Sequence, residues 1–271
     1  MMVEGKVVVV TGAGQGIGAA AARRFAEEGA RVVVSDVNDE TGQEVARLIG
    51  DAGGEAIYVH ADVSSADDVK ALMTASVERF GRLDVLHNNA GVHETGLTAQ
   101  AQSFELPEDV WDRVIAINLK GVWMCSKYAA PHLKDAGGGV IVNAASIGGL
   151  VGYPMGAAYG PSKAGVIQLT RVMAIELAPQ GTRVVAYAPG NTDTPMVQKY
   201  FLDTELSEEE QRVVRRQLVG THLVPRLAEP EEIADLVVFL ASDRARMITG
   251  TCVTIDGGTT AWRGIREGGD E

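Results

Sequence analysis

A chain of 271 residues with 46% hydrophobic and 22% charged residues is long enough to bury one large core and has the composition of a globular protein. Its net charge of −12, from 24 Lys and Arg against 36 Asp and Glu without clustered positive charge, excludes a nucleic-acid surface and disfavours an acidic carrier protein as partner. No apolar run reaches the roughly 18 residues that span a bilayer, so we expect no membrane association.

Two further features bear on the cellular compartment. The first six residues, MMVEGK, lead directly into an apolar stretch and lack the n-region and cleavage site of a signal peptide. Cys125 and Cys252 lie far apart without a His cluster nearby, which favours reduced thiols over a disulfide or a metal site. We therefore expect a cytoplasmic protein without a bound metal.

Strand and helix patterns alternate from the start of the chain to about residue 256. Apolar, β-branched runs predict strands at 6–11, 31–36, 55–60, 83–88, 140–145, 183–188 and 251–255. Helical periodicity predicts helices at 17–28, 39–52, 66–80, 107–117, 119–134, 157–177, 205–218 and 230–240. This alternation predicts a doubly wound α/β fold, in which a seven-stranded parallel sheet carries helices on both faces.

The sequence contains no internal repeat and no Pro/Ser linker that would divide it. We therefore expect residues 1–261 to form a single domain. Within it, the weakly periodic segment at about 191–224 fits a substrate lid, with a surface helix as the alternative. The polar, glycine-rich residues 262–271 predict a loose C-terminal tail.

A glycine-rich turn at 11–18 joins the first expected strand to the first expected helix. Glycine permits positive φ and close approach to a phosphate, and a helix N-terminus offers unpaired N–H groups and a partial positive charge. Many tight turns are glycine-rich, but this strand–turn–helix context is that of a dinucleotide site. The residues expected to contact a dinucleotide here are Gly12, Gln15, Gly16, Ile17 and Gly18.

An acid, Asp36, ends the second expected strand. A carboxylate there can accept hydrogen bonds from both adenosine ribose hydroxyls, whereas a 2′-phosphate would be repelled by roughly 1 kcal/mol in water and about 4 kcal/mol at a surface-like dielectric. Neither Gln15 nor Val37 is basic, so we expect NAD to be preferred over NADP, with Asp36 and Val37 in contact with it. After the third strand, Asp62 and Val63 are candidate adenine contacts, although Asp62 could simply begin a turn.

Tyr159 and Lys163 stand four residues apart in the expected helix 157–177, so they share one face with Cβ atoms roughly 5–6 Å apart. A free tyrosine has a pKa near ~10 and is a poor base at neutral pH. A neighbouring cation can lower a pKa by about 1–3 units, towards a range suited to proton exchange with an alcohol or ketone. Such pairs also occur by chance on amphipathic helices, so the pair indicates a catalytic role only in combination with the other motifs.

Further motifs accompany this pair, and in chain order the set is the turn at 11–18, Asn88-Asn89-Ala90-Gly91, Asn118, Ser146, Tyr159 with Lys163, and Pro189-Gly190. In its order and spacing this set resembles the short-chain dehydrogenase/reductase family over nearly the whole chain. The resemblance implies a single Rossmann-type domain, a nicotinamide cofactor, and hydride transfer to or from a carbonyl carbon. One departure is Thr192, where the family usually has a branched aliphatic residue in a contact that is largely main-chain.

The resemblance implies four catalytic residues. Tyr159 is the general acid/base, as phenolate in alcohol oxidation and as phenol in ketone reduction, and Lys163 lowers its pKa and hydrogen-bonds the nicotinamide ribose. Ser146 follows an apolar strand and would donate to the substrate oxygen, with a plain turn serine as the alternative. Asn118 would hold a water that relays protons, and its amide could also satisfy a kinked helix backbone.

The resemblance also implies further cofactor contacts. One of Asn88 and Asn89 would pin neighbouring strands, and the backbone from 89 to 91 would pass the cofactor ribose. The Pro-Gly turn would open the backbone towards the nicotinamide, whose carboxamide Thr194 could bind. The expected contacts are Asn89, Ala90, Gly91, Tyr159, Lys163, Pro189, Gly190, Thr192 and Thr194.

The expected substrate pocket is apolar or uncharged, and no obvious Arg stands ready to clamp a carboxylate or phosphate. We therefore expect a small, neutral secondary alcohol or ketone, cyclic ones included. Among the histidines only His93 stands at the pocket mouth, and a structural role is its alternative. The expected pocket residues are His93, Ile147, Leu150, Tyr153, Met155, Asn191 and Met196.

The expected helix 157–177 is apolar around most of its circumference, with Val166, Leu169, Val172 and Met173 on different sides. A helix that is apolar all round is expected to be buried, with one side on the sheet and the other on a neighbouring subunit. The resemblance likewise implies a homotetramer built on this helix and the last strand.

Several functions compete, and an NAD-dependent alcohol dehydrogenase or ketone reductase is the leading hypothesis. A ketoacyl reductase of the 3-oxoacyl type is disfavoured by Asp36, by the uncharged Gln15 and by the net acidity. A non-catalytic NAD-binding protein would be expected to lose some of the four catalytic residues, all of which are present. A sugar epimerase of the extended type needs a larger C-terminal lobe than this chain provides.

Overall fold

The computed structural model describes residues 1–201, 207–219 and 222–262. At its centre is a seven-stranded, all-parallel sheet with strand order β3-β2-β1-β4-β5-β6-β7. All seven expected strands are confirmed, and the strand order reverses between β1 and β4, the point where doubly wound folds bind ligands. The strands are β1 (Val7–Thr11), β2 (Arg31–Asp36), β3 (Glu55–His60), β4 (Val85–Asn88), β5 (Val140–Ala144), β6 (Arg183–Pro189) and β7 (Cys252–Ile255).

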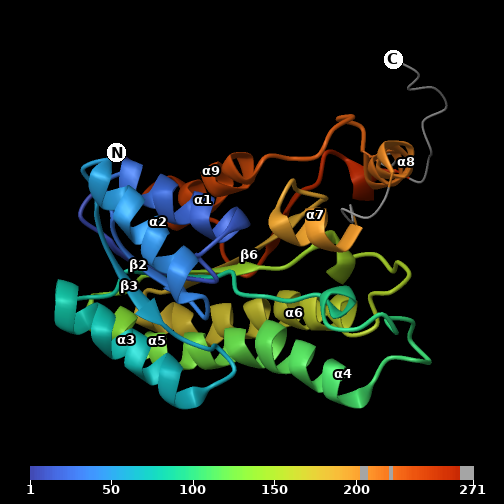
Figure 1. Cartoon of the computed structure of the whole chain (residues 1–271). Coiled ribbons are helices and arrows are strands. Elements are labelled where there is room, and N and C mark those ends of the chain that lie inside the picture. Colours follow the sequence, from blue (N-terminus) through green and yellow to red (C-terminus); the bar gives the residue numbers. More distant parts are fainter. Residues whose placement is uncertain (202–206, 220–221, 263–271) are drawn as a thin grey trace.

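Helices cover both faces of this sheet (Figure 1). In β1, Val8 and Val10 pack into the buried cluster beneath α1, α2 and α9, whereas Val7 and Val9 pack into the cluster beneath α3, α5 and α6. This two-sided burial explains why the strands are continuous apolar runs. The helices are α1 (Gly16–Glu27), α2 (Asp39–Asp51) and α9 (Pro230–Ala241) on one face, and α3 (Ala66–Phe80), α5 (Val122–Asp135) and α6 (Tyr159–Leu177) on the other.

Side-chain caps fix the starts of two of these helices. The side chain of Asn38 accepts a hydrogen bond from the N–H of Thr41 at α2, and Ser65 accepts one from the N–H of Asp68 at α3. Each satisfies an N–H group that has no partner within its own helix. Asn38 is therefore the cap of α2.

The expected helices 107–117 and 119–134 are one continuous unit. α4 (Glu108–Ile115) passes into a π-helical segment, Ala116–Gly121, and then directly into α5. The break expected near residue 118 is thus a local widening of the helix and not a loop. Segments of this kind are frequent at functional sites.

The expected lid at 191–224 contains α7 (Pro195–Phe201), which the sequence did not predict, and α8 (Glu208–Val219), which it did. Residues 202–206 and 220–221 lie outside the described residues. α7 and α8 lie beyond the carboxyl end of β6 (Figure 1), and lid closure stays a prediction. The expected tail also lies outside the described residues except for Trp262.

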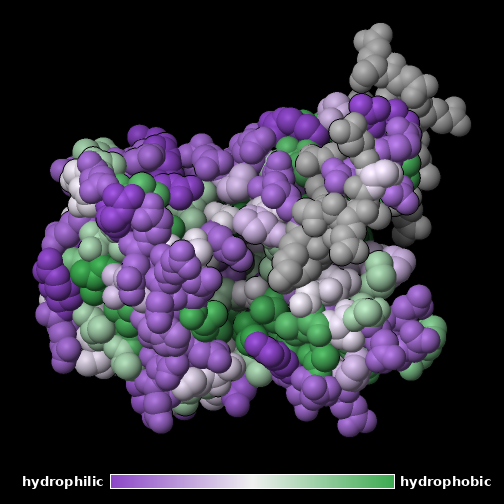
Figure 2. Space-filling view, viewed as in Figure 1, coloured by the Kyte–Doolittle hydropathy of each residue, from purple (hydrophilic) through white to green (hydrophobic). Residues whose placement is uncertain are grey.

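Figure 2 shows hydrophilic residues over most of one face, with a gathering of hydrophobic ones in the region of α4 and α6. Within the part of the chain that the structure describes, no helix combines the length and the apolar character of a membrane span.

Candidate active site

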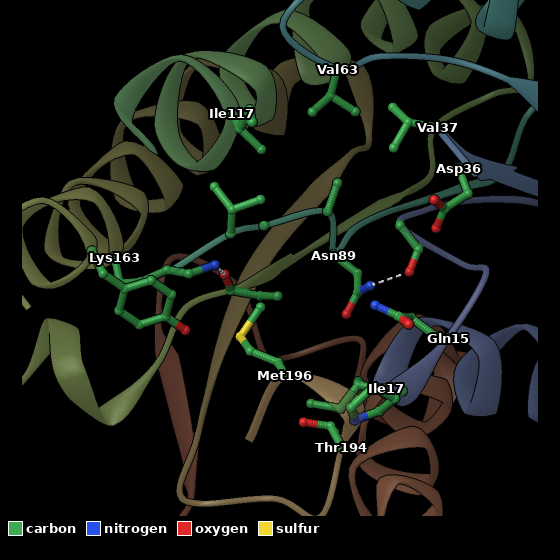
Figure 3. A pocket seen from close by; sticks show the side chains of 18 of the residues that line it. Gln15, Ile17, Asp36, Val37, Val63, Asn89, Ile117, Lys163, Thr194 and Met196 are labelled. Atoms are coloured by element: carbon green, nitrogen blue, oxygen red, sulfur yellow. Dashed lines mark hydrogen bonds between the residues drawn. The ribbon is translucent and has the colours of Figure 1, made fainter. Parts of the chain in front are cut away.

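A cleft of about 410 Å³ lies along the carboxyl ends of the strands, within the range of roughly 300–1,000 Å³ usual for small-molecule sites. Asp36 and Val37 lie towards one end, Lys163 lies at the other, and Asn89 lies between them (Figure 3). The lining includes most cofactor residues predicted from the sequence, and these are Gly12, Gln15, Gly16, Ile17, Asp36, Val37, Asp62, Val63, Asn89, Ala90, Gly91, Tyr159, Lys163, Pro189 and Thr194.

The turn between β1 and α1 requires glycine at several positions. Gly12 and Gly16 have positive φ angles of 62° and 55°. A Cβ at Gly12 would lie 2.7 Å from the Cα of Ala90, and a Cβ at Gly18 would lie 2.1 Å from the carbonyl oxygen of Gly12. Gln15, the N-cap of α1, makes no capping bond with its side chain, so the helix offers N–H groups to the cleft. These residues fit a dinucleotide pyrophosphate, with Gly18 supporting the turn and not lining the cleft.

Asp36 combines a structural role with exposure to the cleft. Its Oδ2 accepts a hydrogen bond from the N–H of Gly14 at 2.8 Å, and its Oδ1 accepts one from the N–H of Asn38 at 3.0 Å. Each carboxylate oxygen carries further lone pairs, so both can still accept from ribose hydroxyls. The carboxylate is thereby held in place at the rim where the adenosine ribose is expected.

One wall of the cleft, between Val37 and Lys163, is apolar. Val63 and Ile117 extend into the cleft from this wall (Figure 3), and such side chains suit contact with an adenine ring. Asp62 also lines the cleft, but its Oδ1 accepts hydrogen bonds from the N–H and hydroxyl of Ser64 at 2.8 and 2.7 Å. The side chain of Asp62 therefore forms the turn that was its alternative interpretation.

Asn88 and Asn89 have different roles, as the sequence analysis expected. The amide of Asn88 donates to Oδ1 of Asn143 at 2.9 Å and so joins β4 to β5. The amide of Asn89 donates to the carbonyl oxygens of Thr11 and Gly12 at 3.1 and 2.9 Å. This second amide fixes the loop after β4 against the glycine turn, and the backbone that follows borders the cleft.

Tyr159 and Lys163 share one face at the start of α6. The Lys163 Nζ lies 5.5 Å from the centre of the Tyr159 ring and donates a hydrogen bond to the carbonyl oxygen of Ala144 at 2.8 Å. Burial lowers the pKa of Lys163 to about 8. A Cβ at Gly91 would lie 3.4 Å from both this Nζ and the Oδ1 of Asn118. The ammonium, the amide and the cofactor-facing loop therefore converge at one point.

The pKa of Tyr159 runs opposite to the sequence prediction. Burial raises it, a hydrogen bond with Ser146 lowers it, and the carboxylate of Glu94 raises it again, with a net upward direction. The chain alone does not lower this pKa, because the removal of the phenol from water outweighs the stabilisation of its ionised form. Ser146 also accepts a hydrogen bond from the N–H of Gly148 at 3.1 Å, so both its catalytic and its turn interpretations fit its contacts.

Asn118 is fully buried in the π-helical segment. Its Oδ1 accepts from the N–H of Val92, and its Nδ2 donates to the carbonyl oxygen of Val92, both at 2.9 Å. Nδ2 also lies 3.2 Å from the hydroxyl of Ser162 on α6. The amide thus binds the backbone of a distant loop and not that of its own helix, which corrects the second interpretation given above.

Only some of the predicted cofactor residues in the turn after β6 line the cleft. Pro189 and Thr194 line the cleft. Gly190 allows close packing, since a Cβ there would lie 2.8 Å from the Cα of Asp256. The side chain of Thr192 is buried and its hydroxyl donates to the carbonyl oxygen of Gly190 at 3.2 Å, so its side chain does not line the cleft.

His93 lies against Tyr159, with ring centres 4.7 Å apart. The backbone N–H of Thr95 donates to His93 Nδ1, so in the neutral ring the proton is on Nε2, which lies 3.1 Å from the hydroxyl of Tyr153. Burial lowers the pKa of His93 although Glu94 raises it, which favours this neutral form. His93 and Tyr153 therefore form one polar unit beside Tyr159.

The other expected substrate residues are dispersed. Met196 lines the cleft. Met155 has a positive φ of 60° and is 43% exposed, and Ile147 begins the short turn after Ser146. Asn191 does not line the cleft, because its amide donates to the carbonyl oxygen of Leu218 at 2.7 Å in α8.

Several residues at the site escaped the sequence analysis. Arg113 lines the cleft, although the sequence analysis found no obvious Arg that could clamp a carboxylate or phosphate; its position one helical turn before Ile117 was the available signal. Glu94 is fully buried beside Tyr159, and no local pattern indicates this. The remaining unpredicted lining residues are Ala61, Val92, Ile117, Ala144, Ala145, Tyr187 and Pro195.

Comparison with known proteins agrees with this geometry. Residues 12–260 match a family described as Enoyl-(Acyl carrier protein) reductase. The chain is 45% identical to cis-4-hydroxycyclohexanecarboxylate dehydrogenase of Sinomonas cyclohexanicum, over 94% of this chain and 97% of that protein. It is 41% identical to 3beta-hydroxysteroid dehydrogenase 1 of Eggerthella lenta (98% and 97%) and 41% identical to meso-2,3-butanediol dehydrogenase of Serratia marcescens (96% and 97%). The chain therefore belongs to the short-chain dehydrogenase/reductase family of oxidoreductases.

Proposed function

We propose that this oxidoreductase transfers hydride between NAD and a secondary alcohol or ketone, with Tyr159 as the general acid/base. The observation that carries the proposal is the pairing within one cleft of Asp36 near one end with Tyr159 and Lys163 at the other. A dinucleotide whose ribose meets Asp36 and whose pyrophosphate meets the start of α1 would reach Tyr159 with its nicotinamide.

Each residue has a part in the oxidation of an alcohol. When bound, oxidised nicotinamide supplies the hydride acceptor and a positive charge that favours the phenolate. Tyr159, as phenolate, takes the hydroxyl proton while the carbinol carbon loses its hydride. Ser146 donates a hydrogen bond to the substrate oxygen, and Lys163 holds a positive charge beside Tyr159. In the reverse direction Tyr159 returns the proton to the carbonyl oxygen.

The charges around the glycine turn support NAD over NADP. Two arginines stand near the turn, but Arg47 pairs with Glu44 and Asp51, and Arg23 lies 3.7 Å from Glu231. Neither offers an uncompensated cation to a 2′-phosphate. The carboxylate of Asp36 would repel that phosphate, so a ketoacyl reductase that works with NADP fits less well.

For the substrate, we propose a small, neutral secondary alcohol, with cyclic alcohols included. Met196 gives the cleft an apolar wall, and the paired His93 and Tyr153 offer a neutral polar contact beside Tyr159. Similar proteins are named for a cyclic hydroxycarboxylate, a hydroxysteroid and a diol, so their names support a secondary alcohol, whereas the neutral class rests on the lining of the cleft.

A substrate panel tests this proposal. Cyclohexanols, vicinal diols and their carboxylate analogues would be supplied with NAD while the absorbance of the reduced cofactor is followed. We expect turnover with neutral members of the panel. Turnover with the carboxylates alone would contradict the neutral class, and no turnover with any member would favour a non-catalytic NAD-binding protein.

We also propose a homotetramer built on α6 and β7. Within the single chain, Val166 and Met173 of α6 are buried, whereas Val172 and Ile175 are 41% and 76% exposed. An exposed apolar face of this kind is typical of a subunit interface. Multi-angle light scattering is expected to give about four times the chain mass of 28.6 kDa, and a monomer would contradict the proposal.

A further inference from the structure

We propose that Glu94 is a positioning residue for Tyr159, because it holds the first turn of the catalytic helix from a loop on the other side of the cleft. The inference rests on the proposed role of Tyr159 as general acid/base. Glu94 begins a short 3₁₀ helix, Glu94–Gly96, directly after the loop that borders the cofactor cleft.

The contacts of Glu94 are those of a helix cap supplied from a distance. Its Oε1 accepts from the N–H of Ala158 at 2.8 Å and of Tyr159 at 3.3 Å, and its Oε2 lies 3.2 Å from the N–H of Tyr159. α6 has no cap of its own, since its N-cap residue is Ala158. A carboxylate at a helix N-terminus is favourable, and these buried N–H groups would otherwise lack a partner.

Because Glu94 is buried, its carboxylate oxygens depend on these hydrogen bonds. Glu94 has 0% exposure, and a buried carboxylate is stable only when its oxygens are satisfied. The first residue of the helix that it caps is Tyr159 itself. A shift of this turn would therefore move the phenol directly, whereas a distant cap would act only on stability.

Glu94 is one of two anchors on the same loop. Asn118 holds the backbone of Val92 against the α4–α5 unit, and Glu94, two residues later, holds α6. The loop between them follows Asn89–Gly91, whose backbone borders the cofactor cleft. The two anchors thus join the cofactor side of the cleft to the side that carries Tyr159.

The charge of Glu94 has a consequence separate from its position. It raises the pKa of Tyr159, and it also raises that of the adjacent Tyr153. Removal of the charge would stabilise the phenolate, so the pKa of Tyr159 would fall and oxidation would begin at lower pH. The titratable groups that surround the phenol are Glu94, His93, Tyr153, Lys163 and Tyr187.

Three variants separate position from charge, and one serves as a matched control. Glu94→Gln keeps the size and an acceptor but removes the charge, Glu94→Asp keeps the charge but shortens the side chain, and Glu94→Ala removes both. Ser65→Ala removes a cap of α3 that lies outside the cleft. Each protein would be assayed for kcat and KM of alcohol oxidation across pH, and for its melting temperature.

The expected results differ between the variants. Glu94→Gln moves the midpoint of the rising limb of kcat/KM to lower pH, Glu94→Asp leaves the midpoint in place but lowers kcat, and Glu94→Ala lowers kcat by up to about 10²-fold. Ser65→Ala lowers the melting temperature without either kinetic change. Should Glu94→Ala fail to fold, Glu94→Asp and Glu94→Gln still decide the matter. An unmoved midpoint in Glu94→Gln, together with a kcat in Glu94→Asp equal to that of Ser65→Ala, would overturn the inference.

A spectroscopic titration keeps this test independent of the proposed function. The ultraviolet absorbance of tyrosinate, taken as the difference from Tyr159→Phe in NAD-bound protein, reports the ionisation of Tyr159 without a substrate. If the enzyme oxidises no alcohol, the proposed function fails, yet the titration midpoint of Glu94→Gln is still expected below that of the wild type. An equal midpoint would reject the charge effect whatever the reaction.

Discussion

Replacement of Tyr159 by Phe is expected to lower kcat for alcohol oxidation by about 10²- to 10⁴-fold, because general acid–base catalysis contributes roughly this much and no other side chain among the described residues is placed to accept the proton. Ser146 has the proposed role of a donor to the substrate oxygen, and the neutral His93 accepts from Thr95 and lies against Tyr153. Steady-state kinetics with the best alcohol from the panel measures the effect.

Cofactor affinity supplies the control for this variant. Phe keeps the ring between Lys163 and His93, so the Kd for NADH, measured by fluorescence titration, is expected to stay within a few-fold of the wild type. A variant that retained both turnover and NADH binding would remove Tyr159 from the chemistry. If the variant also lost NADH binding, the loss of turnover would be explained by structural damage to the cleft. Circular dichroism and the melting temperature would detect such damage.

The second large effect is expected at the adenosine end of the cleft. The wild type should favour NAD over NADP by about 5- to 10³-fold in kcat/KM, which corresponds to a repulsion of roughly 1–4 kcal/mol between the Asp36 carboxylate and a 2′-phosphate. The double variant Asp36→Asn, Val37→Arg removes that charge and adds a cation beside the exposed position 37. We expect it to lose or reverse the preference.

Asparagine is chosen because Asp36 also accepts hydrogen bonds from the backbone. An amide oxygen can still accept from the N–H of Gly14, which keeps the glycine turn in place. The single variant Asp36→Asn serves as the control, with an expected gain for NADP smaller than that of the double variant. Equal use of both cofactors by the wild type would show that Asp36 does not select NAD.

Much of this architecture is readable from local sequence. The strands are continuous apolar runs because both faces are buried, and the glycine turn is visible because Gly12 and Gly16 adopt positive φ. The ends of the strands bring most of the predicted cofactor residues into one cleft. The sequence therefore predicted the backbone of the cofactor site well.

Features that depend on contacts between distant segments could not be predicted from the local sequence. Glu94 meets the N–H of Ala158 only after folding, and its own neighbours in sequence give no sign of burial. The π-helical segment is shaped by close packing, since a Cβ at Gly121 would lie 2.9 Å from Cγ2 of Val63. The direction of the Tyr159 pKa was mispredicted because the spacing to Lys163 reveals a nearby cation but not the burial that opposes it.

Transfer of deuterium from the carbinol carbon to the cofactor tests the central claim most directly. The best alcohol from the panel, deuterated at that carbon, would be oxidised with NAD in a single turnover, and the reduced cofactor would be examined by mass spectrometry. The account predicts that the deuterium appears on the nicotinamide of the wild-type reaction and that Tyr159→Phe produces almost none in the same time. Reduced cofactor without deuterium, or equal transfer by both proteins, would contradict it.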